Sequence, residues 1–412
     1  MNFRLVRNFI IIVTIAIFAF GTGYNVGHSG NPRYSGLSGQ AIFRNTTPPP
    51  TQNIDFGLFW EVWRRLSVNY FDKKALDPQK MLYGAISGMV QALGDPYTVF
   101  LPPNQNKDTK DSLGGHFEGI GAQLGVKDKK IIIVAPLKGT PADISGLKAG
   151  DWIVKVDGKE TANWTLPETV TAIRGPKGTK IVLTIVHKNE DKPVDVSVVR
   201  DTIKVPSVEW SMKNDASSSA SVVYLKLSQF GDQTNDEWNK AVGEIVGKLG
   251  ADNNQKIKGV ILDLRNNPGG YLSGAVYIAS EFLKDGTIVI QEGADGSRNN
   301  FTVNRTGQLL NVPLVVLVNK GSASASEIVG GALQDRKRAK LVGETTFGKG
   351  TIQDVQDLST GAGLHITVAK WLLPSGKWVN GTGVNPDVAV ANDDKNEDND
   401  LQLNKAIEIL VK

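Results

Sequence analysis

Five consecutive apolar residues, Leu314 to Val318, form the most restrictive segment of this 412-residue chain. A strand without alternating polar positions has to be covered on both faces, which is typical of a sheet with helices packed on both sides. A second run of this kind, Val260-Ile261-Leu262, lies upstream, and helical patterns separate the two. We therefore expect a mixed α/β core over residues 206–391. Its expected strands are 221–227, 258–264, 287–290 and 312–318, its expected helices are 235–249, 272–282 and 324–338, strands and turns return over 364–390, and a charged linker and a short helix follow over 392–412.

The apolar run leads into a turn of small residues that carries three serines, Ser322, Ser324 and Ser326. A serine at the junction of strand and helix can present its hydroxyl outward, and the amide of the next residue, Ala325, then faces a developing oxyanion. This arrangement favours Ser324 as a nucleophile. Ser322 is more simply a helix cap, and Ser326 falls on the inward stripe of the expected helix.

Lys349 follows downstream between Gly348 and Gly350. A lysine with its ordinary pKa of about 10.4 is protonated near neutral pH and cannot take a proton from serine, so burial would have to lower its pKa by about two to three units. In an extended segment Lys349 and Gln353 share one face, which lets the Gln353 carboxamide accept a hydrogen bond from the amine. A surface lysine in a glycine turn is the alternative interpretation.

A second glycine-containing loop, with Gly269 and Gly270, follows the expected strand 258–264. One of these two backbone amides would supply the second donor to an oxyanion, and a simple Pro-Gly turn is the alternative. Asp263 and Arg265 precede the two glycines. We interpret them as structural residues, or as residues that support the site without touching the substrate.

Residues 113–205 alternate short apolar strands with two helices that open on proline, an order that resembles a PDZ domain. The expected strands are 120–125, 131–134, 151–156, 181–186 and 194–199, and the helices begin at Thr140-Pro141 and Leu166-Pro167. The functional element is the loop Glu118-Gly119-Ile120-Gly121, whose backbone amides can bind a terminal carboxylate while the adjoining strand edge pairs with the extended tail. We therefore expect the C-terminal tails of proteins or peptides as partners.

The chain begins with two arginines followed by an apolar stretch, Phe9 to Phe20. We interpret residues 1–27 as an uncleaved membrane anchor with the bulk of the chain on the extracytoplasmic side, and a cleaved signal peptide is the alternative. Residues 28–54, rich in Gly, Ser, Asn and Pro, are expected to form a flexible linker. A helical region over 55–112 follows, and its aromatic stripe predicts packing or a contact in a homo-oligomer.

The composition excludes several other classes of protein. Without cysteine, the chain has no disulfide framework, no thiolate nucleophile and no cysteine-ligated metal. Its four histidines are not at metal-site spacing. The net charge of +4 is small, and no basic run with interleaved aromatic residues is present. We therefore expect no cofactor, no metal and no nucleic-acid partner.

Taken in order, these motifs resemble those of the C-terminal processing peptidases, also called tail-specific proteases. The motifs are Asp95-Pro96-Tyr97-Thr98 with Phe100-Leu101-Pro102-Pro103, Phe117-Glu118-Gly119-Ile120-Gly121, Asp263-Leu264-Arg265-Asn266-Asn267-Pro268-Gly269-Gly270, Gly321 to Glu327, and Gly348 to Gln353. The resemblance covers roughly residues 56–390 and implies a serine endopeptidase in which Ser324 is the nucleophile, Lys349 its base and Gln353 the third member. It also maps an acidic residue onto Asp335, but an unbroken helix would hold Asp335 about 16 Å from Ser324, so we interpret it as structural.

Two alternative functions are weaker. Residues 343–349 resemble the start of a phosphate-binding P-loop, but Gly350 stands where Ser or Thr has to ligate magnesium, and the strand-like segment 351–355 follows instead of a helix. A membrane-tethered PDZ scaffold with an inert hydrolase-like domain is less favoured because both members of the Ser324–Lys349 dyad are present. We predict a membrane-anchored serine endopeptidase that binds C-terminal tails and cleaves upstream of them.

Overall fold

The computed structural model describes residues 55–188, 190–215, 218–252, 256–391 and 399–412. The predicted anchor (1–27), the predicted linker (28–54) and the charged segment 392–398 lie outside these residues. No helix within the described ranges is long and apolar enough to cross a membrane. The chain divides into two compact units, residues 1–76 and 77–412.

In the first unit the described residues form helix α2 (Gly57–Asn69) and a short 3-10 turn, η1 (Lys73–Ala75). Phe59 of α2 contacts the rings of Trp60 and Trp63. These contacts follow from the 3.6-residue period, which brings the aromatic residues to one side of the helix. A role of this stripe in an oligomer stays a prediction.

The centre of the second unit is a six-stranded sheet in the order β10-β11-β12-β15-β16-β19. Strand β10 is antiparallel to β11, and all other neighbours are parallel. The strands are β10 (Val208–Asn214), β11 (Ser221–Leu227), β12 (Ile257–Asp263), β15 (Leu314–Val318), β16 (Lys340–Gly343) and β19 (Val388–Ala389). All five residues of β15 are buried, so the mixed α/β core expected from this apolar run is confirmed.

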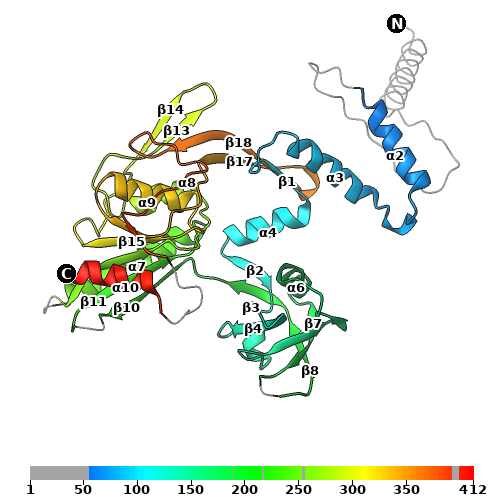
Figure 1. The fold of residues 1–412 in the computed structure, drawn as a ribbon, viewed down its shortest axis with the longest axis horizontal. Helices are drawn as coiled ribbons and strands as arrows, with labels where there is room; N and C mark the ends of the chain where they lie inside the picture. Colours follow the sequence, from blue (N-terminus) through cyan, green and yellow to red (C-terminus); the bar gives the residue numbers. More distant parts are fainter. Residues whose placement is uncertain (1–54, 189, 216–217, 253–255, 392–398) are drawn as a thin grey trace, which may run out of the picture. The chain divides into compact units, whose positions relative to one another are not determined.

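Helices cover both faces of this sheet (Figure 1). They are α7 (Thr234–Gly250), α8 (Leu272–Ala279) and α9 (Ala325–Asp335) on one face and α10 (Leu401–Val411) on the other. Trp238 of α7 and Ile328 of α9 pack in one core with Val316, whereas Ile407 of α10 packs in a second core with Val315. Neighbouring residues of one strand thus face opposite layers, as the pleat requires.

A second sheet in this unit is organised by the long strand β18 (Gly363–Leu372), and its order is β1-β18-β13-β14 with β17 also paired to β18. The other elements are β1 (Val99–Leu101), β13 (Thr287–Gly293), β14 (Arg298–Thr302), β17 (Thr351–Asp357) and η2 (Ser359–Gly361). Strand β1 lies between helices α3 (Pro78–Gln91) and α4 (Pro103–Leu113), in a region expected to be helical. Its pairing of Val99 with His365 joins the segment from α3 to α4 to the second sheet.

Residues 116–204 form a second compact core around the sheet β3-β4-β5-β7-β8, with β6 paired to β5. The elements are β2 (His116–Gly119), β3 (Ala122–Lys127), β4 (Lys130–Pro136), α5 (Pro141–Ile144), β5 (Trp152–Val156), β6 (Lys159–Glu160), α6 (Leu166–Ile173), β7 (Lys180–Val186), β8 (Val194–Val199) and β9 (Asp201–Lys204). Strands β2 and β9 pair with each other, so the chain enters this module and leaves it again at the same place.

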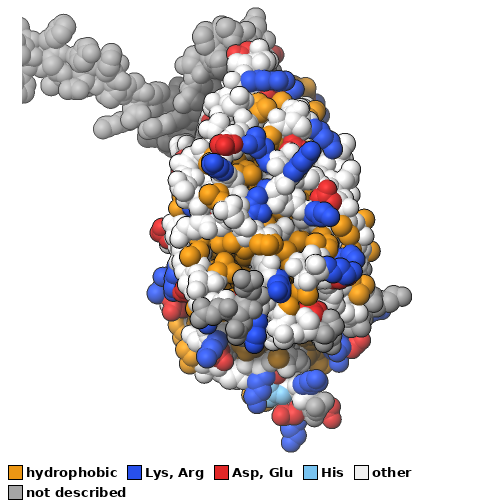
Figure 2. All heavy atoms as spheres, turned by 90° about the vertical axis from the view of Figure 1, so that its left-hand side faces the viewer, with side chains coloured by type: hydrophobic (Ala, Val, Ile, Leu, Met, Phe, Trp, Pro, Cys, Tyr) orange, Lys and Arg blue, Asp and Glu red, His pale blue; other side chains and the backbone are white. Residues whose placement is uncertain are grey.

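Charged side chains on the face drawn in Figure 2 are mixed rather than sorted by sign. Lysine and arginine side chains lie scattered among polar and apolar ones, and a band of hydrophobic side chains crosses the face.

Candidate active site

Ser324 is the residue that precedes helix α9, and its backbone has an unusual conformation. With φ at 53° and ψ at −114°, it lies in a region that residues with a Cβ rarely adopt. Hydrogen bonds hold the turn on both sides: the Ala323 amide donates to the Asn267 carbonyl at 3.0 Å, and the Ser324 amide donates to Glu327 Oε2 at 2.8 Å. Such strain is maintained only where the surrounding structure enforces it.

The three candidate serines differ in exposure. Ser322 and Ser326 are fully buried. Their hydroxyls donate to the carbonyls of Leu264 at 2.8 Å and Asn267 at 2.9 Å, respectively. Ser324 is only partly buried. Of the three hydroxyl side chains, that of Ser324 is the one a substrate can reach.

The carboxylate of Glu327 connects the Ser324 turn to the Lys349 loop. Glu327 lies in the first turn of α9 and is 1% exposed. Its Oε2 accepts the backbone amides of both Ser324, at 2.8 Å, and Lys349, at 2.9 Å. Its Oε1 accepts the Gly348 amide at 2.7 Å and the Thr346 hydroxyl at 2.5 Å. One buried carboxylate therefore brings together two segments that the sequence separates.

The Lys349 side chain is half-buried, and its amine has no carboxylate at ion-pair distance in the described part of the chain. The amine lies 5.1 Å from the centroid of the Tyr97 ring. Burial lowers the pKa of Lys349, and the nearby charge of Asp95 opposes this effect. A lowered pKa favours the neutral amine that a general base needs.

The loop between α3 and β1 adds Asp95 and Tyr97 to this site. Asp95 accepts hydrogen bonds from the Tyr97 amide at 3.0 Å and the Thr98 hydroxyl at 2.6 Å. Burial alone would raise the pKa of Asp95, but hydrogen bonds, the largest from Thr367, outweigh it and lower the pKa. Asp95 is therefore charged at neutral pH. The sequence marked this loop as a family motif without giving it a role.

Gln353 lies on β17, which begins two residues after Lys349. Its carboxamide nitrogen donates to the hydroxyls of Thr351 at 2.9 Å and Thr367 at 3.0 Å. Within the described residues there is no hydrogen bond between Gln353 and the Lys349 amine. The two hydroxyls fix the orientation of the carboxamide nitrogen and leave its oxygen as the atom that can accept.

The loop of Gly269 and Gly270 lies directly against the Ser324 turn. A Cβ on Gly269 would stand 2.9 Å from the Ser324 Cβ and 3.0 Å from the Ala325 amide nitrogen. The Gly269 amide already donates to Asn267 Oδ1 at 2.9 Å. The amides of Gly270 and Ala325 have no acceptor among the described residues. These two amides are therefore available to an incoming oxyanion.

The predicted tail-binding loop runs from Glu118 to Gly121; its first two residues end strand β2, and Ile120 and Gly121 lie between β2 and β3. The carbonyls of Ile120 and Gly121 accept hydrogen bonds from the module itself, whereas their amides have no acceptor within the described ranges. Gly121 has a φ of 78°, and a Cβ there would stand 2.4 Å from the Thr140 Cβ, so the loop requires glycine. Glu118 forms an ion pair with Lys107 of α4 at 2.9 Å.

The P-loop alternative is wrong, because the backbone amides of this segment are already occupied. The amides of five consecutive residues donate to protein acceptors: Thr346 to Val384, Phe347 to Ser322, Gly348 and Lys349 to Glu327, and Gly350 to Asn380. A phosphate would need these donors. Strand β17 follows instead of the helix that a P-loop requires.

The residues of the described ranges do not include a group of three or more His, Cys, Asp or Glu side chains that could hold a metal ion.

Three other charged residues from the sequence motifs, Asp335, Asp263 and Arg265, bind other parts of the protein. Asp335 is the last residue of the unbroken helix α9, at the end opposite Ser324, and its Oδ2 accepts the Ser375 amide at 2.9 Å. Asp263 and Arg265 form an ion pair at 2.6 Å. These positions agree with the supporting roles expected for them.

Comparison with known proteins identifies a peptidase family and a PDZ domain in this chain. Residues 221–390 match the model of peptidase family S41, and residues 132–186 match a PDZ domain. A carboxy-terminal-processing protease of Bartonella bacilliformis is 39% identical over 333 residues, which are 81% of this chain and 74% of that protein. The carboxy-terminal processing protease CtpA of Bacillus subtilis is 35% identical over 389 residues, with coverages of 94% and 78%. Among solved structures, the photosystem II D1 C-terminal processing protease matches with a TM-score of 0.50 and 30% identity, over 81% of this chain and 92% of that one.

Proposed function

Because this chain belongs to the carboxy-terminal processing proteases of peptidase family S41, which are serine peptidases, we propose that Ser324 and Lys349 form its catalytic dyad. The observation that carries the proposal is the shared acceptor Glu327 Oε2, which lies within 3 Å of the backbone nitrogens of both residues. The half-buried amine of Lys349, with its lowered pKa, supports the role of base.

In the proposed reaction the neutral Lys349 amine takes the proton of the Ser324 hydroxyl as Oγ attacks the carbonyl carbon of the scissile bond. The amides of Gly270 and Ala325 stabilise the resulting oxyanion. The Lys349 ammonium then returns its proton to the leaving amine, and an ester of Ser324 remains. Lys349 next takes a proton from water, which attacks the ester, and the collapse of that intermediate returns the proton to Ser324. The Gln353 carboxamide oxygen would orient the amine.

We further propose that the PDZ module binds the free C-terminus of the substrate. Two amides, those of Ile120 and Gly121, are free to bind a carboxylate, and the adjoining strand β3 can pair with an extended tail. The serine lies in a different core, so one substrate would engage two separate sites. Binding at the first site raises the local concentration of the scissile segment at the second.

An extracytoplasmic, membrane-anchored location for this protease also remains our proposal, and it rests on the arginine-flanked apolar stretch Phe9 to Phe20. The full-length chain should stay in the membrane pellet after an alkaline carbonate wash. Its release into the supernatant would contradict the anchor.

The aromatic stripe of α2 is proposed as a contact in a homo-oligomer. Sedimentation of the chain with and without residues 55–76 would test this proposal.

The substitution Asp95→Asn should move the rising limb of the pH–rate profile to lower pH. The Asp95 charge stabilises the ammonium form and so raises the pKa of Lys349. Without it this pKa falls, and more of the amine is neutral at any given pH. Asparagine keeps an oxygen that can accept the Tyr97 amide. The measurement is kcat/KM against pH for wild type and variant, with Asp285→Asn, an exposed carboxylate, as the control. A limb that stays in place or moves to higher pH would count against Lys349 as the base.

A peptide with a free C-terminal carboxylate should be cleaved faster than its amidated counterpart, about tenfold or more at low substrate concentration. Gly121→Ala should abolish this preference while leaving cleavage of the amidated peptide unchanged, because a Cβ there displaces the loop around Thr140. Gly247→Ala on α7, where a Cβ meets open space, is the matched control. Equal rates for the two peptides with the wild-type chain would disprove tail capture and leave the dyad untouched.

A further inference from the structure

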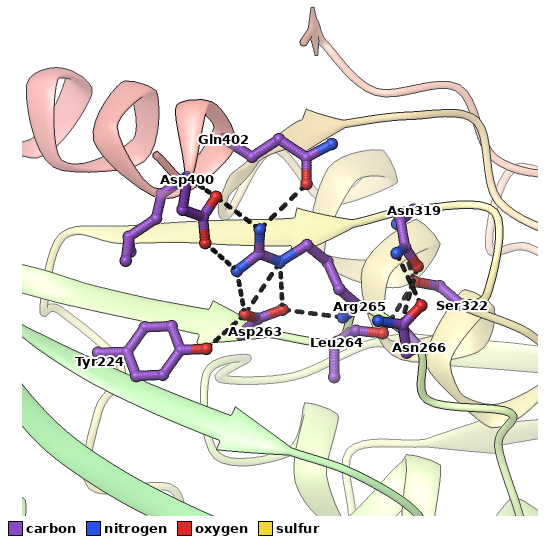
Figure 3. A network of polar contacts seen from close by, with 10 residues as sticks. Tyr224, Asp263, Leu264, Arg265, Asn266, Asn319, Ser322, Asp400 and Gln402 are labelled. Atoms are coloured by element: carbon purple, nitrogen blue, oxygen red, sulfur yellow. Dashed lines mark hydrogen bonds and ion pairs between the residues drawn. The ribbon is translucent and has the colours of Figure 1, made fainter. Parts of the chain in front are cut away.

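A buried polar network joins the C-terminal helix α10 to the loop that carries Gly269 and Gly270 (Figure 3). At its centre is Arg265, whose side chain is 10% exposed. The guanidinium donates to both oxygens of Asp263, with a shortest distance of 2.6 Å. Its two terminal nitrogens also bind both oxygens of Asp400, each at 2.8 Å. This fork-to-fork geometry is the strongest that an arginine and a carboxylate can form.

The Asp400 side of the network is firmly held. Asp400 caps α10 by accepting the Leu403 amide at 2.9 Å. Gln402, which is fully buried, accepts from Arg265 at 3.1 Å and donates to the Val390 carbonyl at 2.8 Å. Helix α10 itself packs on the face of the sheet opposite α9. The position of Asp400 is therefore fixed by the core.

Both charges of the pair persist at neutral pH. Burial would lower the pKa of Arg265, but hydrogen bonds to Asp400 and Asp263 outweigh it and raise the pKa. Burial would likewise raise the pKa of Asp400, but the hydrogen bond from Arg265 outweighs it and lowers the pKa. Loss of Asp400 would take two charge-assisted hydrogen bonds from the largely buried guanidinium of Arg265, which would keep Asp263 as its carboxylate partner.

The loop side of the network continues to the nucleophile turn. Asn266, the residue after Arg265, has a φ of 58°, and its amide donates to Asn319 Oδ1 at 2.9 Å. The Asn319 carboxamide donates back to Asn266 Oδ1 at 2.9 Å, and its backbone amide donates to the Ser322 hydroxyl at 3.0 Å. Figure 3 shows Arg265 and Asn266 pointing to opposite sides of the loop, toward α10 and toward Asn319. The ion pair of Arg265 thus holds the loop to α10, and the hydrogen bonds of Asn266 hold it to the Ser324 turn.

We propose that Asp400 is a positioning residue for catalysis: the C-terminal helix acts through the Asp400–Arg265 pair to hold the loop from Asn266 to Gly270 in register with Ser324. The inference rests on the proposed role of the Gly270 amide as an oxyanion donor. Oxyanion stabilisation acts in the transition state, so the pair should affect kcat and leave KM unchanged. It should also leave the pH–rate profile unchanged, because Lys349 lies on another loop.

The test is Asp400→Asn in the full-length chain. Asparagine keeps one oxygen that can cap α10. Its NH₂ group, however, would face a guanidinium nitrogen of Arg265, and two donors cannot form a hydrogen bond with each other. We expect kcat per active site to fall about ten- to a hundredfold, as a displacement near 1 Å produces. The KM for a tail-bearing peptide and the apparent pKa of the rising limb should stay at the wild-type values. Active sites are counted by the burst of an acylating substrate, so a loss of folded protein does not appear as a loss of kcat.

Glu408→Gln is the matched control, because Glu408 lies on the same helix, is 41% exposed and pairs with Lys405 rather than with Arg265. It should leave kcat unchanged. If Asp400→Asn does not fold, Asp400→Ser keeps a capping hydroxyl without the charge and carries the same expectation. A wild-type kcat per active site in the folded variant would overturn the proposal. Failure of the dyad itself is a separate result, since it would appear as absence of a Ser324 ester in the wild-type chain.

Discussion

Replacing Lys349 by alanine is expected to lower kcat for peptide cleavage by about 10⁴-fold or more, because the Ser324 hydroxyl then has no positioned base. Lys349→Arg should be equally inactive, since a guanidinium does not lose its proton near neutral pH. The measurement is kcat on a tail-bearing peptide, with the thermal unfolding midpoint as evidence that the variants fold. Lys349 makes no ion pair in the described part of the chain, so its loss should cost little stability.

Ser326→Ala serves as the control for the dyad. Its hydroxyl is fully buried and donates to the Asn267 carbonyl, so the substitution should cost about 1 kcal/mol of stability and retain substantial activity. Substantial cleavage by Lys349→Ala would contradict the dyad. Loss of all activity in a folded Ser326→Ala protein would mean that the wrong serine has been assigned.

The second large effect is expected for Glu327→Gln. Each carboxylate oxygen of Glu327 accepts two hydrogen bonds, so the amide nitrogen of glutamine would have to face two donors wherever it is placed. We expect kcat to fall about a hundredfold as Ser324 and Lys349 lose their common anchor. The free energy of unfolding should fall by about 2 to 4 kcal/mol, because buried donors are left unpaired.

Glu344→Gln is the matched control for Glu327, because it lies on the loop that leads to Lys349 but pairs with a lysine side chain that is 83% exposed. An exposed pair contributes about 1 kcal/mol or less, so neither kcat nor stability should change much. Denaturant unfolding and steady-state kinetics on both variants give the comparison. A wild-type kcat in Glu327→Gln would show that the shared carboxylate does not position the dyad.

Local patterns predicted most of the regular structure. Strand β11 spans 221–227, the range expected from its apolar residues, and the proline-opened helices of the PDZ module begin where Thr140-Pro141 and Leu166-Pro167 placed them. These elements were predictable because burial of both faces, or a cap followed by proline, depends on residues close together in the sequence.

Features that depend on distant partners were not predictable in this way. Strand β1 has three residues and exists because β18 pairs with it, more than 250 positions later. The role of Asp95 depends on its distance from Lys349, and the Arg265–Asp400 pair joins residues 135 positions apart. Glu327 did carry a signal, because an acid three residues after a serine at a helix start is the pattern of a capping box. Its second function, as an acceptor for the Lys349 loop, requires the fold.

Covalent labelling shows whether Ser324 is the nucleophile. The full-length chain is incubated with a fluorophosphonate, digested, and the modified peptide is mapped by mass spectrometry. We expect modification at Ser324, no modification in Ser324→Ala, and labelling that is strongly slowed in Lys349→Ala. Equal labelling of Ser324→Ala, or stoichiometric modification of a different serine in the wild-type chain, would show that Ser324 is not the nucleophile.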